Sequence, residues 1–119
     1  ISLQMKGIHE AIDTSEIRTH YDYEELLNKD SEIDLRYTSY WEIHDEKFIR
    51  NVIQDDVWPG HAGEYETSVA MYMFPDLVDE DAIKNDPLGT SSNASKEKGE
   101  QIYKDIINQY SKIISEMLQ

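Results

Sequence analysis

One short segment of this chain, residues 33–40, has the alternation of apolar and polar residues that is typical of a β-strand. The apolar members are Ile33, Leu35 and Tyr37, and the polar members between them are Asp34, Arg36 and Thr38. Side chains of a strand point alternately to its two faces, so this spacing predicts a strand. A lone strand leaves both of its edges unpaired. The sequence therefore predicts that the chain completes a sheet whose other strands come from elsewhere.

Most of the remaining chain is predicted to be helical. The stretch 95–118 is the clearest, because apolar residues recur in it at spacings of three and four: Ile102, Ile106, Tyr110, Ile113 and Met117. The stretch 64–74 is nearly all apolar towards its end, so we expect that helix to be buried. Residues 79–93 are predicted to form a long acidic loop rich in Ser and Gly. Shorter helices are expected at residues 1–12, 23–27 and 45–53.

The composition narrows the possible partners. With 25 Asp and Glu against 11 Lys and Arg, the formal net charge of the 119 residues is −14, which argues against nucleic acid and against an anionic membrane as partners. The chain has no cysteine and therefore neither disulfides nor thiolate metal sites. No apolar run approaches the roughly 20 residues of a membrane span. We therefore expect a cytoplasmic protein.

The start of the chain indicates that it belongs to a larger unit. Ile1, Met5, Ile8 and Ile12 recur at helical spacing, and no helix start signal precedes them. The length fits one domain or part of one. Together with the lone strand, this pattern predicts that residues 1–119 do not fold stably without a partner segment.

The run with the most chemical content is residues 60–68, which read GHAGEYETS. His61 lies among small residues just before a predicted helix, where it can meet a ligand without steric hindrance. Gly60 and Gly63 let the backbone approach a substrate or adopt φ > 0. The first amides of a helix are unpaired donors, which suit an anionic or carbonyl oxygen. A solvated histidine on a glycine-containing loop is the alternative interpretation of the same spacing.

Three segments resemble one known family. Residues 60–78, GHAGEYETSVAMYMFPDLV, resemble the His-Ala/Gly-Gly-x-x-Glu-Thr-Ser segment of the creatininase (creatinine amidohydrolase) family with its trailing Pro-x-Leu-Val. Residues 91–100, SSNASKEKGE, resemble the Ala-Ser-x-Glu-Lys-Gly opening of that family's last helix, and residues 39–41, SYW, resemble its Ser-Tyr-Trp. The three occur in the family's order. The resemblance covers residues 36–119 well and 1–12 weakly.

This resemblance implies a fold and a missing half. The family has a three-layer α/β/α domain, so we expect an α/β fold in which residues 1–119 supply the C-terminal portion, mainly helices and one or two strands. The family's metal ligands lie in its first half, ahead of the segments matched here, so we expect them to lie outside this chain. Divalent Zn or Mn would then be held by an N-terminal half or partner chain. Family members form ring-like homo-oligomers, commonly hexamers, so assembly is expected.

The resemblance also implies site residues. The family's histidine matching His61 is a catalytic acid/base that serves the leaving nitrogen, and amide hydrolysis needs one because an amine leaves poorly unless it is protonated. Glu66 is expected to orient or charge His61 or to hold substrate, with a helix N-terminal acid as the alternative. Trp41, Trp58 and Gly63 are expected to contact substrate. A core tryptophan is the alternative for Trp41, and Trp58 lies one position off the family's spacing.

The other charged residues have simpler interpretations. Glu64 is expected to be a helix N-terminal acid stabilised by the helix dipole, and Glu97, Lys98 and Glu100 are expected to form a solvated helix face. His9 and His20 have carboxylates nearby, which is a combination suited to Zn or Mn. Because Asp, Glu and His are about a quarter of the chain, such pairs arise by chance. His44 has no partner pattern.

Two functions remain open at this stage. In the first, the chain is part of a metal-dependent amidohydrolase that hydrolyses a cyclic amide, formamide or similar C–N bond, with His61 protonating the departing nitrogen. In the second, it is a non-catalytic partner subunit or pseudo-enzyme that keeps the same half of the fold and serves assembly. An adjacent N-terminal half with metal ligands would favour the first.

Overall fold

The computed structural model describes residues 34–119, and the chain divides into two units, residues 1–39 and 40–119. In the first unit the described residues, 34–39, form no regular element. The Arg36 guanidinium there pairs with the Asp34 carboxylate at 3.3 Å. The helices predicted at 1–12 and 23–27, and Ile33 of the predicted strand, lie outside the described residues.

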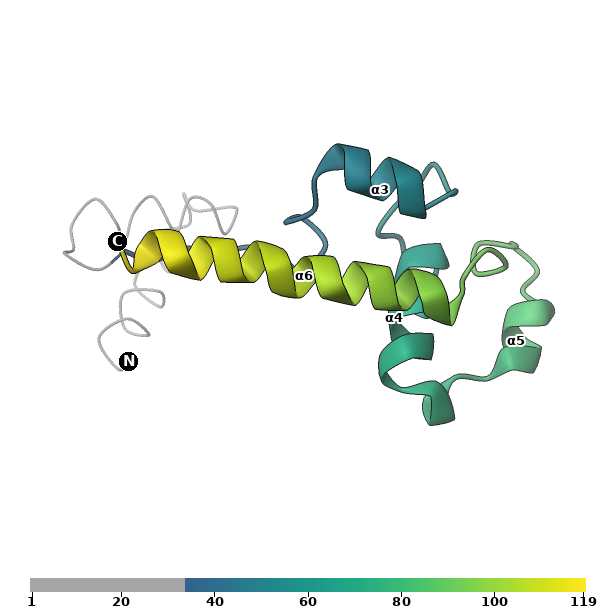
Figure 1. Cartoon of the computed structure of the whole chain (residues 1–119). Helices are drawn as coiled ribbons and strands as arrows, with labels where there is room; N and C mark the ends of the chain where they lie inside the picture. Colours follow the sequence, from purple (N-terminus) through teal and green to yellow (C-terminus); the bar gives the residue numbers. More distant parts are fainter. Residues whose placement is uncertain (1–33) are drawn as a thin grey trace, which may run out of the picture. The chain divides into compact units, whose positions relative to one another are not determined.

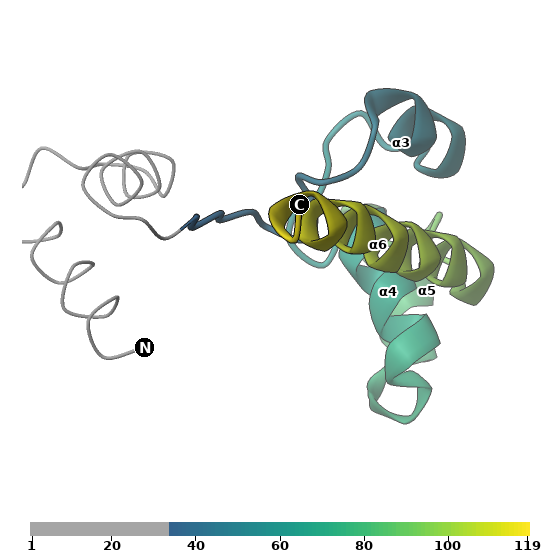
Figure 2. The ribbon, with the colours of Figure 1, turned by 60° about the vertical axis from the view of Figure 1, so that its left-hand side comes forward.

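The second unit is built from helices alone. They are α3 (Glu46–Val52), α4 (Glu64–Met73), the 3₁₀ helix η1 (Pro75–Leu77), α5 (Glu80–Lys84) and α6 (Lys96–Met117), as Figure 1 shows. The most extensive packing is between α4 and α6, and α3 makes a smaller contact with α6. Figures 1 and 2 place α3 and α4 on different sides of α6. The long α6 is therefore the element around which the unit is organised.

The predicted α/β fold is wrong for this part of the chain, because residues 34–119 contain no strand. The alternation at 33–40 is a pattern of side chains, whereas a strand is defined by backbone hydrogen bonds to a neighbouring strand. No second strand lies within 34–119 to supply such bonds. Tyr37, one of the apolar residues of the alternation, is exposed.

The helix predictions that fall within residues 34–119 are confirmed, with one omission. The segment 45–53 is α3 with its two flanking cap residues, and 95–118 is α6, whose N-cap Ser95 accepts a hydrogen bond from the Lys98 N–H at 3.2 Å. The predicted loop 79–93 contains α5. Asp79 caps that helix by accepting from the N–H groups of Asp81 and Ala82, both at 3.0 Å. Asp79 followed by an acidic first turn is a pattern that predicts the start of a helix, so α5 could have been expected from sequence.

The core is small and lies where α3, α4 and α6 meet. Its buried apolar residues are Ile49, Val52, Ile53, Tyr65 and Ile102. The expected burial of the apolar end of α4 is only partly found: Tyr65 and Ser68 in its first two turns are buried, but Met73 at its end is exposed. Among residues 34–119, no helix is both long and apolar enough to cross a membrane.

Candidate functional site

His61 lies on a turn whose backbone is held in the left-handed region on both sides. Gly60 has φ +64° and Ala62 has φ +50°. Glycine adopts such angles at no steric cost, but for alanine they cost about 1–2 kcal/mol. The His61 side chain is exposed, and no side chain within residues 34–119 forms a hydrogen bond to its imidazole. The turn therefore presents the imidazole outward.

Two side chains from the first turn of α4 hold Ala62 in this conformation. The Glu66 carboxylate accepts a hydrogen bond from the Ala62 N–H at 2.8 Å, and the Thr67 hydroxyl donates to the Ala62 carbonyl at 3.0 Å. Both backbone groups of the strained residue are therefore satisfied by side chains. Glu66 thus contacts the backbone next to His61 and not the imidazole itself.

Two hollows meet at His61. The first has a volume of about 330 Å³ and is lined by Asp55, Asp56, Val57, Gly60, His61, Gly63 and Thr90. The second, of about 370 Å³, is lined by Ala62, Thr67 and residues of the α5 helix and of the loop that follows it, including Leu88 and Thr90. Of the residues predicted to contact substrate, Gly63 shares the first hollow with His61. Gly63 is also the N-cap of α4, and no side chain caps that helix.

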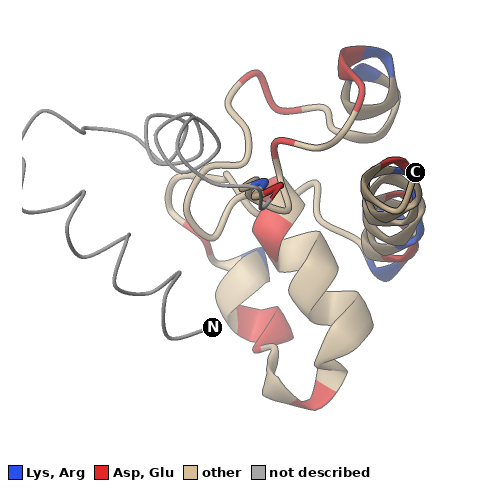
Figure 3. Cartoon of the chain, turned by 90° about the vertical axis from the view of Figure 1, so that its left-hand side faces the viewer, with Lys and Arg blue, Asp and Glu red and all other residues tan. Residues whose placement is uncertain are grey.

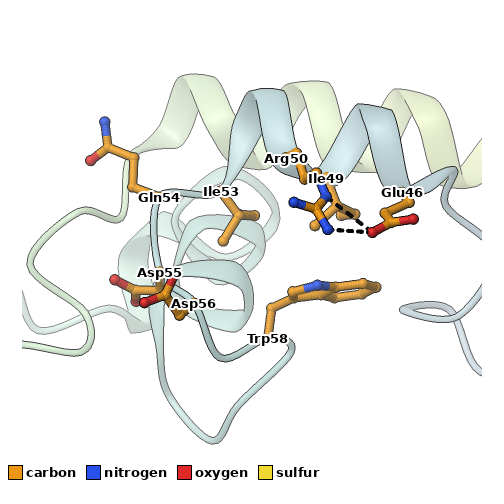
Figure 4. A pocket seen from close by; sticks show the side chains of 8 residues that line it. All are labelled: Glu46, Ile49, Arg50, Ile53, Gln54, Asp55, Asp56 and Trp58. Carbon is orange, nitrogen blue, oxygen red and sulfur yellow. Dashed lines mark hydrogen bonds and ion pairs between the residues drawn. The ribbon is translucent and has the colours of Figure 1, made fainter.

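The other two predicted substrate residues lie elsewhere. Trp58 lines a groove of about 450 Å³ beside α3, where its indole ring lies across from Ile49 and Arg50 (Figure 4). Asp55 and Asp56 line both this groove and the first hollow at His61. Trp41 packs against the core, and its ring centre is 4.9 Å from that of Tyr40.

The two longest motifs, residues 60–68 and 91–100, are brought together where α4 meets the start of α6. The Glu64 carboxylate forms an ion pair with the Lys98 ammonium. The Ser68 hydroxyl accepts from the Ser95 N–H at 3.1 Å. At Gly99 a Cβ atom would lie only 1.9 Å from the Ser68 carbonyl oxygen, so the two helices approach more closely than any other residue permits.

This arrangement corrects two sequence interpretations. Glu64 was expected to be an ordinary acid of the first helical turn, but it is only 1% exposed. Lys98 was expected on a solvated face, but its ammonium reaches Glu64 and the Asn93 carbonyl. Glu100 does belong to the solvated face, where it pairs with Lys104 at 2.7 Å, and this pairing lowers the pKa of the Glu100 carboxyl.

His44, which has no sequence signal, lies in a buried network. Its Nδ1 is 2.6 Å from the Asp105 carboxylate and its Nε2 is 2.7 Å from the Tyr65 hydroxyl. Because a carboxylate only accepts, the Nδ1–H group donates to Asp105. Burial raises the pKa of Tyr65, with smaller contributions from Tyr40 and Asp105. The network ties three elements together and holds Tyr65 as a neutral phenol.

The loop after α5 forms one wall beside His61 and is organised by Asp86. Its carboxylate accepts from the Leu88 N–H, the Thr90 hydroxyl, and the N–H and hydroxyl of Ser91, all at 2.9–3.1 Å. Chiefly the Ser91 and Leu88 N–H groups lower the pKa of Asp86 to about 2. Thr90, which lines both hollows, is fixed by this loop.

Within residues 34–119 no group of three or more His, Asp or Glu side chains is arranged to hold a metal ion. His9 and His20 lie outside the described residues. Figure 3 shows acidic residues along the loop that follows α3 and at the first turn of α4, whereas α6 carries both signs of charge. Two of these acids, Asp55 and Asp56, line the first hollow at His61.

Comparison of the chain with family models, with curated proteins and with solved structures gives no match. The family resemblance carried by residues 39–41, 60–78 and 91–100 therefore rests on those motifs alone.

Proposed function

We propose that residues 60–68 form the part of the active site that transfers a proton in a metal-dependent amidohydrolase. Such an enzyme cleaves a cyclic amide, formamide or similar C–N bond. The observation that carries the proposal is the presentation of His61. Its imidazole is exposed between two hollows, on a turn whose strained backbone is held by Glu66 and Thr67. Backbone strain that the surrounding structure maintains is concentrated at functional sites.

His61 serves as the general acid for the leaving nitrogen in this proposal. An imidazole can give and take a proton near neutrality. An amine leaves poorly unless it is protonated, and a positioned proton donor accelerates such a step by about 10²–10⁴. Glu66 and Thr67 are positioning residues, because they act on His61 through the backbone of Ala62.

The metal ions of such an enzyme fall outside this part of the chain. No group of three or more candidate ligands lies within residues 34–119. The roles proposed for residues 34–119 are therefore proton transfer and substrate contact. An N-terminal half or a partner chain would supply the Zn or Mn ligands, and a homo-oligomer remains part of the proposal.

The test is turnover by the full-length protein, or by the chain combined with a partner that carries the metal ligands, on a panel of cyclic amides and formamides. His61→Ala and His61→Gln should each lower kcat by about 10²–10⁴. The loss should fall on kcat more than on KM, because the proton is needed only in the transition state. Substrates with better leaving groups should be affected less.

Controls keep this test specific. Metal content and the unfolding midpoint should stay unchanged in both variants, because His61 is neither a ligand nor part of the core. Lys104→Met, on the exposed side of α6, should keep wild-type turnover. Wild-type kcat in His61→Gln, or no turnover of any compound on the panel by the metal-loaded protein, contradicts the proposal.

A second function is favoured by a different observation. Large apolar side chains are exposed on both walls beside His61, with Val57 exposed by 78% and Leu88 by 81%. Exposed apolar residues around a hollow are typical of a surface that meets a partner. In this alternative the chain is a non-catalytic assembly subunit, and turnover by the assembled protein would be insensitive to His61→Gln.

A further inference from the structure

The buried Glu64 carboxylate, at the start of α4, is bonded to two other segments. One of its oxygens accepts from the backbone N–H groups of Gln54 and Asp55, both at 2.8 Å. The other oxygen accepts from the Lys98 ammonium. Glu64 itself is the first residue of α4. One side chain therefore connects the loop after α3, the start of α4 and the start of α6.

Lys98 extends the connection to a fourth segment. Its ammonium also donates to the Asn93 carbonyl at 2.8 Å, and the Asn93 side-chain amide reaches the Asp55 carboxylate at 3.4 Å. The loop before α6 is therefore tied to the loop after α3. Both loops line the first hollow at His61, one through Asp55 and Asp56 and the other through Thr90.

We propose that Glu64 and Lys98 are a positioning pair that fixes the walls of the His61 hollow and thereby substrate binding. This inference rests on the proposed function of His61. The pair touches no residue that would carry a proton, so it is not part of the chemistry. It acts on the backbone of Gln54 and Asp55, and through Asn93 on the loop that carries Thr90.

A purely stabilising role is the competing explanation, and the geometry argues against it. A buried ion pair contributes little net stability compared with apolar residues of the same size, because both charges lose their water. The particular gain from a carboxylate at this place is that it satisfies two adjacent loop amides at once, which no apolar side chain can do. The arrangement specifies where the loop lies.

Four variants of the full chain, in the assembled protein, test the proposal. Glu64→Gln keeps one acceptor oxygen but loses the charge, and Lys98→Met removes the cation. Lys98→Arg keeps the charge and serves as the conservative variant in case the other two are poorly folded. The matched control is Lys104→Met, which breaks the exposed Glu100–Lys104 pair on the same helix.

The first measurement needs no activity. Amide hydrogen exchange at Gln54 and Asp55 should become about 10–100-fold faster in Glu64→Gln and Lys98→Met, because their charged acceptor is weakened or lost. Exchange at Ile102, in the core of α6, should stay as in the wild type. Lys98→Arg should lie between, and Lys104→Met should change neither. Exchange that rises equally at all these amides indicates plain destabilisation and overturns the proposal.

The second measurement is steady-state kinetics under conditions where every variant is folded. The first two variants should lose up to about 10²-fold in kcat/KM, the usual effect of a displaced binding wall. The loss should lie in KM, and the pH profile should keep its shape because His61 is untouched. Locally faster exchange with unchanged KM overturns the proposal. If the wild-type protein shows no turnover, the proposed function is contradicted instead. The exchange pattern alone then decides whether the Glu64–Lys98 pair positions the loop.

Discussion

The two halves of α6 differ in their contacts with other elements and in how exposed their apolar side chains are. In its first two turns the helix meets α4 through the Glu64–Lys98 ion pair, the Ser68–Ser95 hydrogen bond and the close approach at Gly99. Ile102 follows with 0% exposure. In its last turns Ile114 is 54% exposed and Met117 39% exposed, and Leu118 just after the helix is 83% exposed.

This contrast separates what residues 34–119 determine by themselves from what they leave open. The half of α6 that packs against α4 finds its partners within the described residues. In the distal half and just after it, the large apolar side chains of Ile107, Ile114, Met117 and Leu118 are exposed. The expectation that the chain does not fold stably without a partner segment stays a prediction, and these exposed apolar side chains are a physical reason for it.

The largest effect should come from Gly99→Ala. An alanine Cβ would lie 1.9 Å from the Ser68 carbonyl oxygen and 2.8 Å from the Tyr72 Cβ, so α4 and α6 must move apart. We expect a loss of about 3 kcal/mol or more in the free energy of unfolding, although alanine is intrinsically the better helix former. Urea unfolding of the assembled protein measures it, with the exposed Gln101→Ala as control. A stabilised Gly99→Ala would show that the close contact is absent.

A matched pair of isoleucines sharpens the comparison within one helix. Ile102→Ala should lower the free energy of unfolding by about 2–5 kcal/mol, because it opens a cavity in the core. Ile114→Ala should change it by no more than about 0.5 kcal/mol, because much of its side chain is already in water. The same unfolding experiment compares them. Equal losses would show that the distal half of α6 is covered after all.

Sequence reasoning succeeded where the signal is local. The limits of α3 and α6 follow from cap residues and periodicity, and the turn at Gly60–Ala62 was expected from its small residues. It failed where the answer depends on a distant residue. Residues 33–40 show the alternation of a strand, but the neighbour that a strand requires is not in residues 34–119. His44 and Asp105 are 61 positions apart, and no pattern near either one indicates the other.

Glu64 shows the same limit inside the candidate site. An acid in the first turn of a helix is usually exposed and needs no partner beyond the helix dipole, so its sequence position gave no reason to expect burial. Its partners, Gln54, Asp55 and Lys98, lie 9–34 positions away. The motif around Lys98 was noticed from sequence, but its connection to Glu64 is visible only when α4 and α6 are placed together.

The smallest effect, and the one with a pH signature, concerns the Asp86 loop that forms a wall beside His61. Because the pKa of Asp86 is lowered to about 2 in the folded chain, from an ordinary value of 3.8, the ionised carboxylate stabilises the fold above about pH 4. That stabilisation is lost as the pH falls towards 2. Asp86→Asn should therefore lower the unfolding midpoint slightly at neutral pH, and its difference from the wild type should shrink between pH 4 and 2.

Asp76→Asn, on the exposed η1, controls for removal of one negative charge. A difference that stays constant down to pH 2 would show that the four hydrogen bonds to Asp86 do not depend on its charge, and the loop carrying Thr90 would then owe its shape to Gly89 and the backbone turns alone.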